Sequence, residues 1–541
     1  MFRKMMGGAA VAAVLLAAGM ASAQDFSAAR ISDNIRTISA DEYQGRYPGT
    51  EGERMVLSWL QAQYEAIGLE PGGPDGRWLQ PVELKRYTPV AGAASASWTG
   101  PDGQVHPLTP GTDIIVRAAT NDGRASIRDA GVVFVGHGIY APERQWDDYG
   151  DIDVRGKVVV VVGGEPDGER FNGEYATNYQ SGASKADEAF RRGAIGIITL
   201  APQPAASPMW QGALRGAARS RTLTPGAADL EFSGAIPHDT AAAWAAAAGL
   251  DISQLPNIAD GSFKAVALPG VSLSVEAAET IETLVTHNLL ARIPGTEHPD
   301  ETIIYSAHWD HVGGAAQHPN APGDNIWNGA WDNASGTIGV LEMARQIKAA
   351  PAPKRSIVFA HMAAEEMGLM GAYGYAANPV YPLETTVADI NIDMLPLSGA
   401  TRDVPIFGKG QNELEDRLQA LAEPLGRYVS DDGMPEEGFY YRSDHFPFAR
   451  MGVPAIMPWH GWDWVDGGRE AGEATWRAKF AADYHRASDE WSADWDLTSA
   501  VENLTLLYHL GLDLANSGDW PGWKPTSEFA VVRARSDAAR Q

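Results

Sequence analysis

The chain has 541 residues, a globular composition with 44% hydrophobic residues, and a formal net charge of -27 at pH 7. This length exceeds one ordinary domain core, so it predicts two domains or one large domain with an insertion. The strong acidity argues against nucleic acid and anionic membrane surfaces as partners. The chain contains no cysteine, which excludes disulfide and thiol chemistry.

The N-terminus has the three parts of a signal peptide. Arg3 and Lys4 precede a short apolar stretch, and "ASA" at 21–23 is typical of a cleavage site. We therefore expect residues 1–23 to be removed, the mature chain to begin at Gln24, and the protein to be periplasmic or secreted. An uncleaved membrane anchor is the alternative. No later segment is apolar enough to predict a membrane span, so no stable insertion is expected after removal of the signal.

The first half of the mature chain predicts helices followed by a β-rich unit. Residues 25–70 are expected to be helical, because apolar residues in "ERMVLSWLQAQYEAIGL" recur on one helix face. Val-rich runs bounded by glycine predict strands within 110–205, together with a helix and strand in "SKADEAFRRGAIGIITL". The segment "DTAAAWAAAAGL" predicts a further helix.

From about residue 283 the pattern alternates between strands and long helices. Strands are expected in "ETIIYSAH", "RSIVFAHM" and "TVADINIDML", and helices in "DNASGTIGVLEMARQIKAA" and "NELEDRLQALAEPLG". This alternation predicts an α/β fold, a doubly wound and mostly parallel sheet flanked by helices. Sites in such sheets lie at the carboxyl ends of the strands.

Ionisable residues follow each of these predicted strands. They are His308 and Asp310, then Asp332 in the loop that opens the next helix, then Glu365, Glu366 and Asp393, with His485 far downstream. Two histidines and three carboxylates can hold two Zn²⁺ ions, one carboxylate bridging. Adjacent glutamates at a strand end repel each other unless cations offset the repulsion. One glutamate could then bind metal while its neighbour takes a proton from the attacking water, and Asp310 could orient the His308 ring.

Five motifs in order, "SAHWDH", "GAWDNASG", "AAEEMGLMGA", "NIDM" and "YHRASDE", resemble those of the co-catalytic di-zinc exopeptidases. The resemblance implies that His308 and Asp393 bind one zinc, that Glu366 and His485 bind the other, and that Asp332 bridges. It also implies that Glu365 is the general base and that Asp310 orients His308.

The same resemblance implies an organisation of the whole chain. A signal peptide (1–23) would precede an N-terminal helical part (24–95), an inserted protease-associated domain that is β-rich (96–283), the di-zinc peptidase domain (284–520) and a C-terminal tail (521–541). The implied function is an exopeptidase acting on peptide substrates, and above all an aminopeptidase.

Further residues and two other functions complete the predictions. Tyr484 is a candidate donor to the developing oxyanion, and Asp444 and His445 are candidates for the rim of the site. Structural or surface roles are expected for His311, His361 and His460. A carboxypeptidase or dipeptidase of the same fold would need arginines for the substrate carboxylate, for which Arg442 and Arg450 are available. A binding protein that keeps the fold without catalysis is the remaining alternative.

Overall fold

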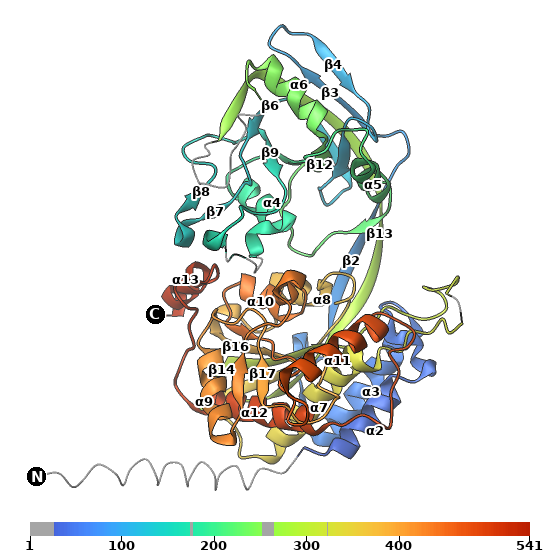
Figure 1. The fold of residues 1–541 in the computed structure, drawn as a ribbon, viewed down its shortest axis with the longest axis vertical. Coiled ribbons are helices and arrows are strands. Elements are labelled where there is room, and N and C mark those ends of the chain that lie inside the picture. Colours follow the sequence, from blue (N-terminus) through green and yellow to red (C-terminus); the bar gives the residue numbers. More distant parts are fainter. Residues whose placement is uncertain (1–25, 172, 174–176, 252–264, 322, 541) are drawn as a thin grey trace, which may run out of the picture.

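The computed structural model describes residues 26–171, 173, 177–251, 265–321 and 323–540. The predicted signal peptide, 1–23, lies outside these described residues. The chain forms two parts, joined by a long two-stranded ribbon (Figure 1). No helix within the described ranges is long and apolar enough to cross a membrane.

The larger part is built on a mostly parallel sheet. Strand β14 (His298–His308) pairs in parallel with β15 (Arg355–Met362) and with β16 (Thr386–Asn391), and β16 pairs in parallel with the short β19 (Ala455–Ile456). Strand β13 (Val266–Ile293) adds to β15 in antiparallel orientation. Every residue of β15 and β16 is buried, which explains why these strands read as continuous apolar runs rather than as alternating patterns.

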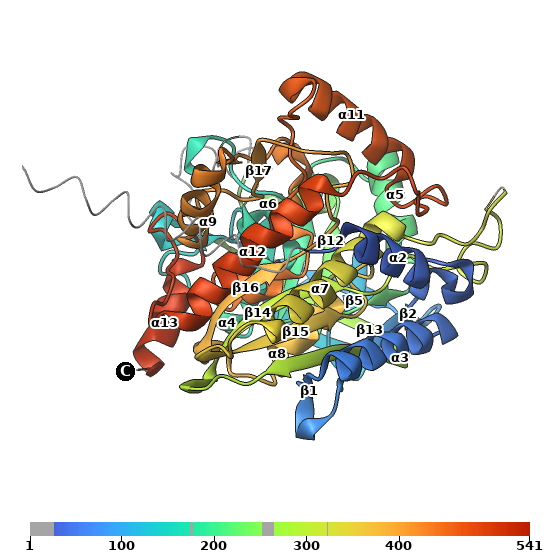
Figure 2. The ribbon, with the colours of Figure 1, turned by 90° about the horizontal axis from the view of Figure 1, so that it is seen from below.

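Helices cover both faces of this sheet (Figures 1 and 2). Ile303 and Tyr305 of β14 point into a core shared with α2, α3, α7 and α12, whereas Ile304 points into a second core with α8 and α10. The bounds of these helices are α2 Ala28–Ile38, α3 Glu51–Ile67, α7 Gly336–Ala349, α8 Met370–Ala377, α10 His445–Arg450 and α12 Thr498–Asn516. The predicted α/β fold with a mostly parallel sheet and flanking helices is thereby confirmed.

The smaller part is the β-rich unit. Its sheet runs in the order β6-β9-β10-β12-β5, parallel except for β5, and β3 and β4 extend a hairpin along β13. The strands are β3 Ser95–Thr99, β4 Val105–Leu108, β5 Ile115–Ala118, β6 Arg124–Phe134, β9 Val158–Val162, β10 Gly196–Leu200 and β12 Phe232–Ile236, and the helices are α4 Gly182–Arg191, α5 Pro208–Ala217 and α6 His238–Ala247.

The two parts share the long strand β13. Strand β2 (Leu79–Pro89) pairs with β13 without interruption from Leu79↔Leu289 to Pro89↔Glu279, and further along β13 pairs with β3 and β6 of the smaller part. The boundary predicted at 283/284 therefore falls inside a continuous strand. A hydrogen-bonded strand pair is stiffer than a loop linker, so the ribbon restricts how the two parts can move.

Smaller elements complete the fold. They are β1 Glu70–Pro71, β7 Tyr140–Ala141, β8 Trp146–Asp147, β11 Arg221–Thr222, β17 Asp403–Pro405, β18 Tyr428–Ser430, α9 Leu414–Ala422, α11 Gly468–Asp483 and α13 Ala530–Arg540. Helix α13 lies in the segment predicted as a C-terminal tail. Arg533 of α13 donates to the Thr386 carbonyl oxygen at 3.1 Å, which fastens this segment to the start of β16.

Arg46 holds two loops in place, the one that follows His308 and the one that precedes Asp332. Its guanidinium is fully buried and donates to the carbonyl oxygens of Trp309, Asn328 and Gly329 at 2.6–2.9 Å, as well as to Ile38. Burial lowers the pKa of Arg46 to about 10, although nearby carboxylates including Asp489 and Asp310 favour the charged form. The preceding Gly45 has a φ of +61°, and a Cβ there would lie 2.4 Å from the Trp327 carbonyl oxygen.

Replacing Arg46 by methionine should destabilise the protein by about 3 kcal/mol or more, because buried carbonyl oxygens lose their donors at once. We expect a lower urea midpoint of unfolding by circular dichroism. Arg54→Met is the matched control, since Arg54 makes an exposed ion pair with Glu51 on helix α3, and it should shift stability by less than about 0.5 kcal/mol. Equal midpoints for the two variants would contradict the role given to Arg46.

Candidate metal centre

Five of the predicted side chains meet at the carboxyl edge of the parallel sheet. His308 is the last residue of β14, Glu365 and Glu366 follow β15, and Asp393 follows β16. Asp332 comes from the irregular turn Ala330–Ser335 that opens α7. Because parallel strands end at one edge, residues far apart in the sequence arrive at one place.

Two groups of possible ligand atoms form there: His308, Asp332 and Asp393 in the first, and His311, Asp332 and Glu366 in the second, which His485 also adjoins. Asp332 belongs to both groups. In the first, His308 Nε2 lies 3.3 Å from Asp332 Oδ1 and 3.4 Å from Asp393 Oδ1. In the second, His485 Nε2 lies 3.2 Å from Asp332 Oδ2 and 2.9 Å from Glu366 Oε2. Asp332 thus presents one oxygen to each group, which is the arrangement of a bridging carboxylate.

These spacings fit a zinc-type ion in each group. Imidazole nitrogens and carboxylate oxygens bind Zn²⁺ at about 2.0–2.2 Å, so two tetrahedral ligand atoms are separated by roughly 3.3 Å. The separations around His308 match that value, and those around His485 are slightly shorter. A mixed set of imidazoles and carboxylates is also the set that zinc accepts.

The pKa shifts show how strongly these groups interact. Burial opposes a charge on His308, but Glu365 and Asp393 outweigh it and hold its pKa well above the ordinary value. Burial also opposes charge on His485, whose pKa is raised to about 10 by Asp332 and Glu366. Burial, with Glu366 and Asp393 adding to it, raises the pKa of Glu365 well above its usual range, although His308 acts in the other direction. The carboxylates concentrate negative charge at the site, and a bound cation would reduce their mutual repulsion.

The backbone around the adjacent glutamates is held in an uncommon conformation. Ala364, directly before Glu365, has a φ of +53°, and Met394, directly after Asp393, has a φ of +56°. Such left-handed backbone costs about 1–3 kcal/mol and persists where surroundings impose it. Gly371 permits a close backbone approach, because a Cβ at this position would lie 2.4 Å from both the nitrogen and the oxygen of Ala363.

The prediction that the Asp310 carboxylate accepts a hydrogen bond from His308 is wrong. His308 Nδ1 lies 3.1 Å from the backbone carbonyl oxygen of Asp310, whereas the carboxylate oxygen Oδ1 is 3.9 Å away. Instead, Oδ1 accepts the backbone N–H of Glu365 at 3.0 Å. The turn after β14 brings the main-chain oxygen to the imidazole, so Asp310 orients His308 through its backbone and the glutamate loop through its side chain.

His311 requires a second correction. It was expected to be structural or on the surface, but its side chain is fully buried and Nδ1 lies 2.7 Å from Glu366 Oε1. Although His311 is a member of the second ligand group, it contacts Oε1, whereas His485 contacts the other carboxylate oxygen, Oε2, at 2.9 Å. We therefore interpret His311 as a donor that leaves Glu366 Oε2 directed at His485. His361 and His460 do have structural contacts, with the Tyr64 hydroxyl and the Trp331 indole N–H respectively.

Two further residues were missed by the sequence analysis. Asp489, four residues after His485, accepts the backbone N–H groups of Trp331 and Asp332 at 2.8 and 2.9 Å. Ser443 donates to Asp393 Oδ2 at 2.7 Å. Asp489 lies in the motif "YHRASDE", and Ser443 directly precedes the candidate Asp444. A short polar residue in a loop carries no signal of what it contacts.

The three candidate substrate residues occupy different surroundings. The Tyr484 ring stacks on His485 with centroids 3.9 Å apart, which places it beside the metal ligands. Asp444 is fully buried, and burial raises its pKa well above the usual range, with His308 opposing the shift. His445 is also buried and packs against the Tyr440 ring, with centroids 4.9 Å apart. Their catalytic roles stay predictions.

Comparison with known proteins agrees with this geometry. Residues 288–509 match Peptidase family M28. This part of the chain is similar to peptidase family M28, which agrees with the predicted resemblance to zinc exopeptidases. The M28 segment begins within β13 and contains all five metal-ligand candidates.

Relatives match over limited stretches. Aminopeptidase NAALADL1 of Mus musculus is 33% identical over 166 residues, 29% of this chain and 20% of that protein. Aminopeptidase YwaD of Bacillus subtilis (strain 168) is 32% identical over 162 residues, 29% of this chain and 31% of its own length. This chain therefore spans less than a third of either relative. Among solved structures, the aminopeptidase from Aneurinibacillus sp. strain AM-1 has 18% identity and a TM-score of 0.43, covering 92% of this chain and 96% of that one.

His311→Phe should weaken zinc binding at the Glu366 position by about 10–100-fold, as expected for loss of a residue that orients a ligand. His311→Asn is the matched control, because an asparagine amide can donate from nearly the position of Nδ1, and it should retain most of the affinity. Competition with a chelating dye measures both dissociation constants. Unchanged zinc affinity in His311→Phe, or an equal loss in both variants, would contradict the role of His311 as a donor.

Proposed function

We propose that this protein is an exported, zinc-dependent exopeptidase, and specifically an aminopeptidase that removes N-terminal residues from peptides. The observation that carries the proposal is Asp332 placed between two ligand groups, with Glu365 beside them: Glu365 Oε2 lies 3.9 Å from His308 Nε2. His308 and Asp393 would hold one zinc ion, Glu366 and His485 the other, and Asp332 would bridge.

When bound, two such ions supply Lewis acidity, which polarises a peptide carbonyl and lowers the pKa of a water molecule. Glu365 accepts the proton of the attacking water and delivers it to the leaving amine. Its side chain is only 11% exposed, and this seclusion, together with the neighbouring carboxylates, suits a group that must accept a proton. Tyr484, whose ring stacks on His485, would donate to the developing oxyanion.

Two observations favour an aminopeptidase over a carboxypeptidase. The relatives named above are aminopeptidases by name. In addition, the arginines that were considered for a substrate carboxylate already have partners: Arg450 pairs with Asp187 of the smaller part, and Arg442 lies 3.6 Å from Glu437. Export stays part of the proposal and rests on the signal-like N-terminus.

Substitutions of the two adjacent glutamates should have different effects on kcat and on zinc content. Glu365→Gln keeps the shape and removes the proton acceptor, so kcat should fall by about 10²–10⁴-fold or more while about two zinc ions per chain remain. Glu366→Gln removes an anionic ligand, so one zinc should bind weakly and excess zinc should restore part of the activity. Zinc content and kcat, each with and without added zinc, measure both. Loss of zinc from Glu365→Gln with both ions retained in Glu366→Gln would reverse the assignment.

Acetylation of a substrate's N-terminus should lower kcat/KM by roughly tenfold or more, because a site that binds a free α-ammonium group is left with unpaired polar groups. The matched control is the same peptide with an amidated C-terminus, which should be cleaved at nearly the unmodified rate. Loss of cleavage on amidation rather than on acetylation would favour the carboxypeptidase alternative. Equal cleavage of all three peptides would favour an endopeptidase.

A further inference from the structure

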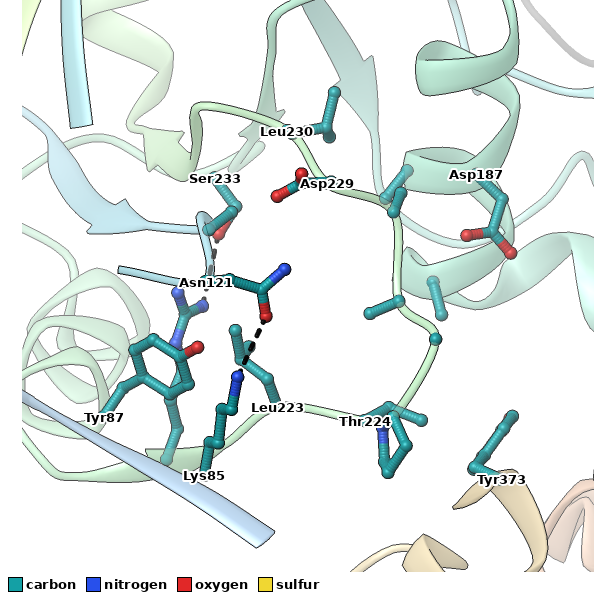
Figure 3. Close-up of a pocket in the computed structure, with 18 of the residues that line it drawn as sticks. Lys85, Tyr87, Asn121, Asp187, Leu223, Thr224, Asp229, Leu230, Ser233 and Tyr373 are labelled. Atoms are coloured by element: carbon teal, nitrogen blue, oxygen red, sulfur yellow. Dashed lines mark hydrogen bonds between the residues drawn. The ribbon is translucent and has the colours of Figure 1, made fainter. Parts of the chain in front are cut away.

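A cavity of about 1280 Å³ lies between the two parts of the protein, apart from the metal centre. Its walls come from the ribbon strand β2, from β11 and the loop after it, from α4, and from α8 of the larger part (Figures 1 and 3). None of the five metal-ligand candidates lines it. Much of the lining is apolar and is contributed by Val161, Ile197, Leu223, Leu230, Val285 and Val380.

One wall presents cationic and hydroxyl groups on a single face. Lys85 and Tyr87 are two residues apart on β2, and Arg221 pairs directly opposite Tyr87 across the antiparallel β2–β11 ladder. Alternation along a strand places all three side chains on the same side. Figure 3 shows Lys85 and Tyr87 extending side by side, with Lys85 Nζ 3.4 Å from Asn121 Oδ1.

Hydrogen-bond donors on this wall lack acceptors among the described residues. Arg221 donates to Ser233 Oγ at 3.2 Å and to the Ala118 carbonyl oxygen at 2.6 Å, but its Nε has no partner there. The Tyr87 hydroxyl is buried and likewise has none. Both atoms are covered by the surrounding protein, and a buried donor without an acceptor costs about 1–3 kcal/mol, so a small shift of the wall that lets an acceptor reach them would be favourable.

This wall carries an excess of positive charge, because some cationic side chains of the lining have a carboxylate partner and others do not. Arg117 is neutralised by Glu279 at 2.6 Å, and Arg450 by Asp187. No carboxylate lies within ion-pair distance of Lys85 or Arg221 in the part of the chain that the structure describes.

The other charged groups on the lining alter this balance little. Lys185 is buried and donates to the His137 carbonyl oxygen at 2.6 Å, and burial lowers its pKa to about 8. The remaining acids of the lining, Glu83 and Asp229, are exposed, so solvent and salt screen their charge, although Asp229 adds to burial in raising the pKa of Tyr87.

From these features we propose that the cavity is a binding site for a small organic carboxylate with an apolar body. The carboxylate would lie against Arg221, Tyr87 and Lys85, and the apolar body would fill the space towards Leu223 and Leu230. Guanidinium and ammonium groups beside an apolar lining are the usual means of binding such ligands. Because Tyr373 and Gly374 of α8 also line the cavity, the ligand would touch both parts of the protein.

The test uses the full mature protein with its zinc and two probes, N-acetyl-L-leucine and its amide, N-acetyl-L-leucinamide. Isothermal titration should show saturable binding of the acid and at least tenfold weaker binding of the amide. Arg221→Gln and Lys85→Gln should each weaken binding of the acid by about tenfold, the loss expected for one charge-assisted hydrogen bond. Arg86→Gln is the matched control, because Arg86 is exposed on the opposite face of β2, and it should bind as the unmodified protein does.

Three outcomes would overturn the proposal. They are no binding of the acid, equal binding of the acid and amide, and unchanged binding in both Arg221→Gln and Lys85→Gln. The titration is repeated after chelation of zinc, which separates this cavity from the metal centre. Binding that disappears with zinc but survives both substitutions would place the carboxylate at the metals and refute the cavity site. The titration measures binding and not peptidase activity, so its outcome tests the cavity site independently of the proposed function.

Discussion

Several carboxylates are buried together at one edge of the larger sheet, and their mutual repulsion has to be offset by the groups around them. Asp310, Asp332, Glu366 and Asp393 are held within the same small region, and Glu365 is nearly as secluded. Two like charges about 4 Å apart repel by about 4 kcal/mol at an effective dielectric of 20. Such a cluster is tolerable only when cations and hydrogen-bond donors surround it, and the fold supplies both.

The supporting contacts are distributed around the cluster and come from distant parts of the chain. Arg46, near the N-terminus, places a buried positive charge behind the site and holds two of its loops. Asp489 fixes the backbone of the Asp332 turn, and Ser443 fixes one oxygen of Asp393. These contacts restrict the orientation of the carboxylates, and Asp332 directs Oδ1 towards His308 and Oδ2 towards His485.

The smaller part contacts segments of the larger part that lie next to the metal centre. Asp187 of α4 pairs with Arg450 of α10, and the backbone N–H of Asn178 donates to Glu528 at 3.1 Å. Glu528 also accepts from the Tyr441 hydroxyl, two residues before Ser443. The segment that orients a metal-ligand candidate is thus also the segment on which the β-rich unit rests. Together with the β2–β13 ribbon, these contacts give the two parts a defined arrangement around the cavity.

The α/β fold and the residue types at the strand ends can be predicted from the amino-acid sequence, because buried strands and helix faces have strong apolar periodicities. The ordered motifs also indicate His308, Asp332, Glu366, Asp393 and His485 as the metal-ligand candidates. The groups that hold these residues are seen only in the folded chain: the carbonyl rather than the carboxylate of Asp310, the imidazole of His311, the hydroxyl of Ser443 and the guanidinium of Arg46. Periodicity reports burial within one element, whereas these contacts join residues hundreds of positions apart, and their geometry exists only after the sheet and its loops have packed.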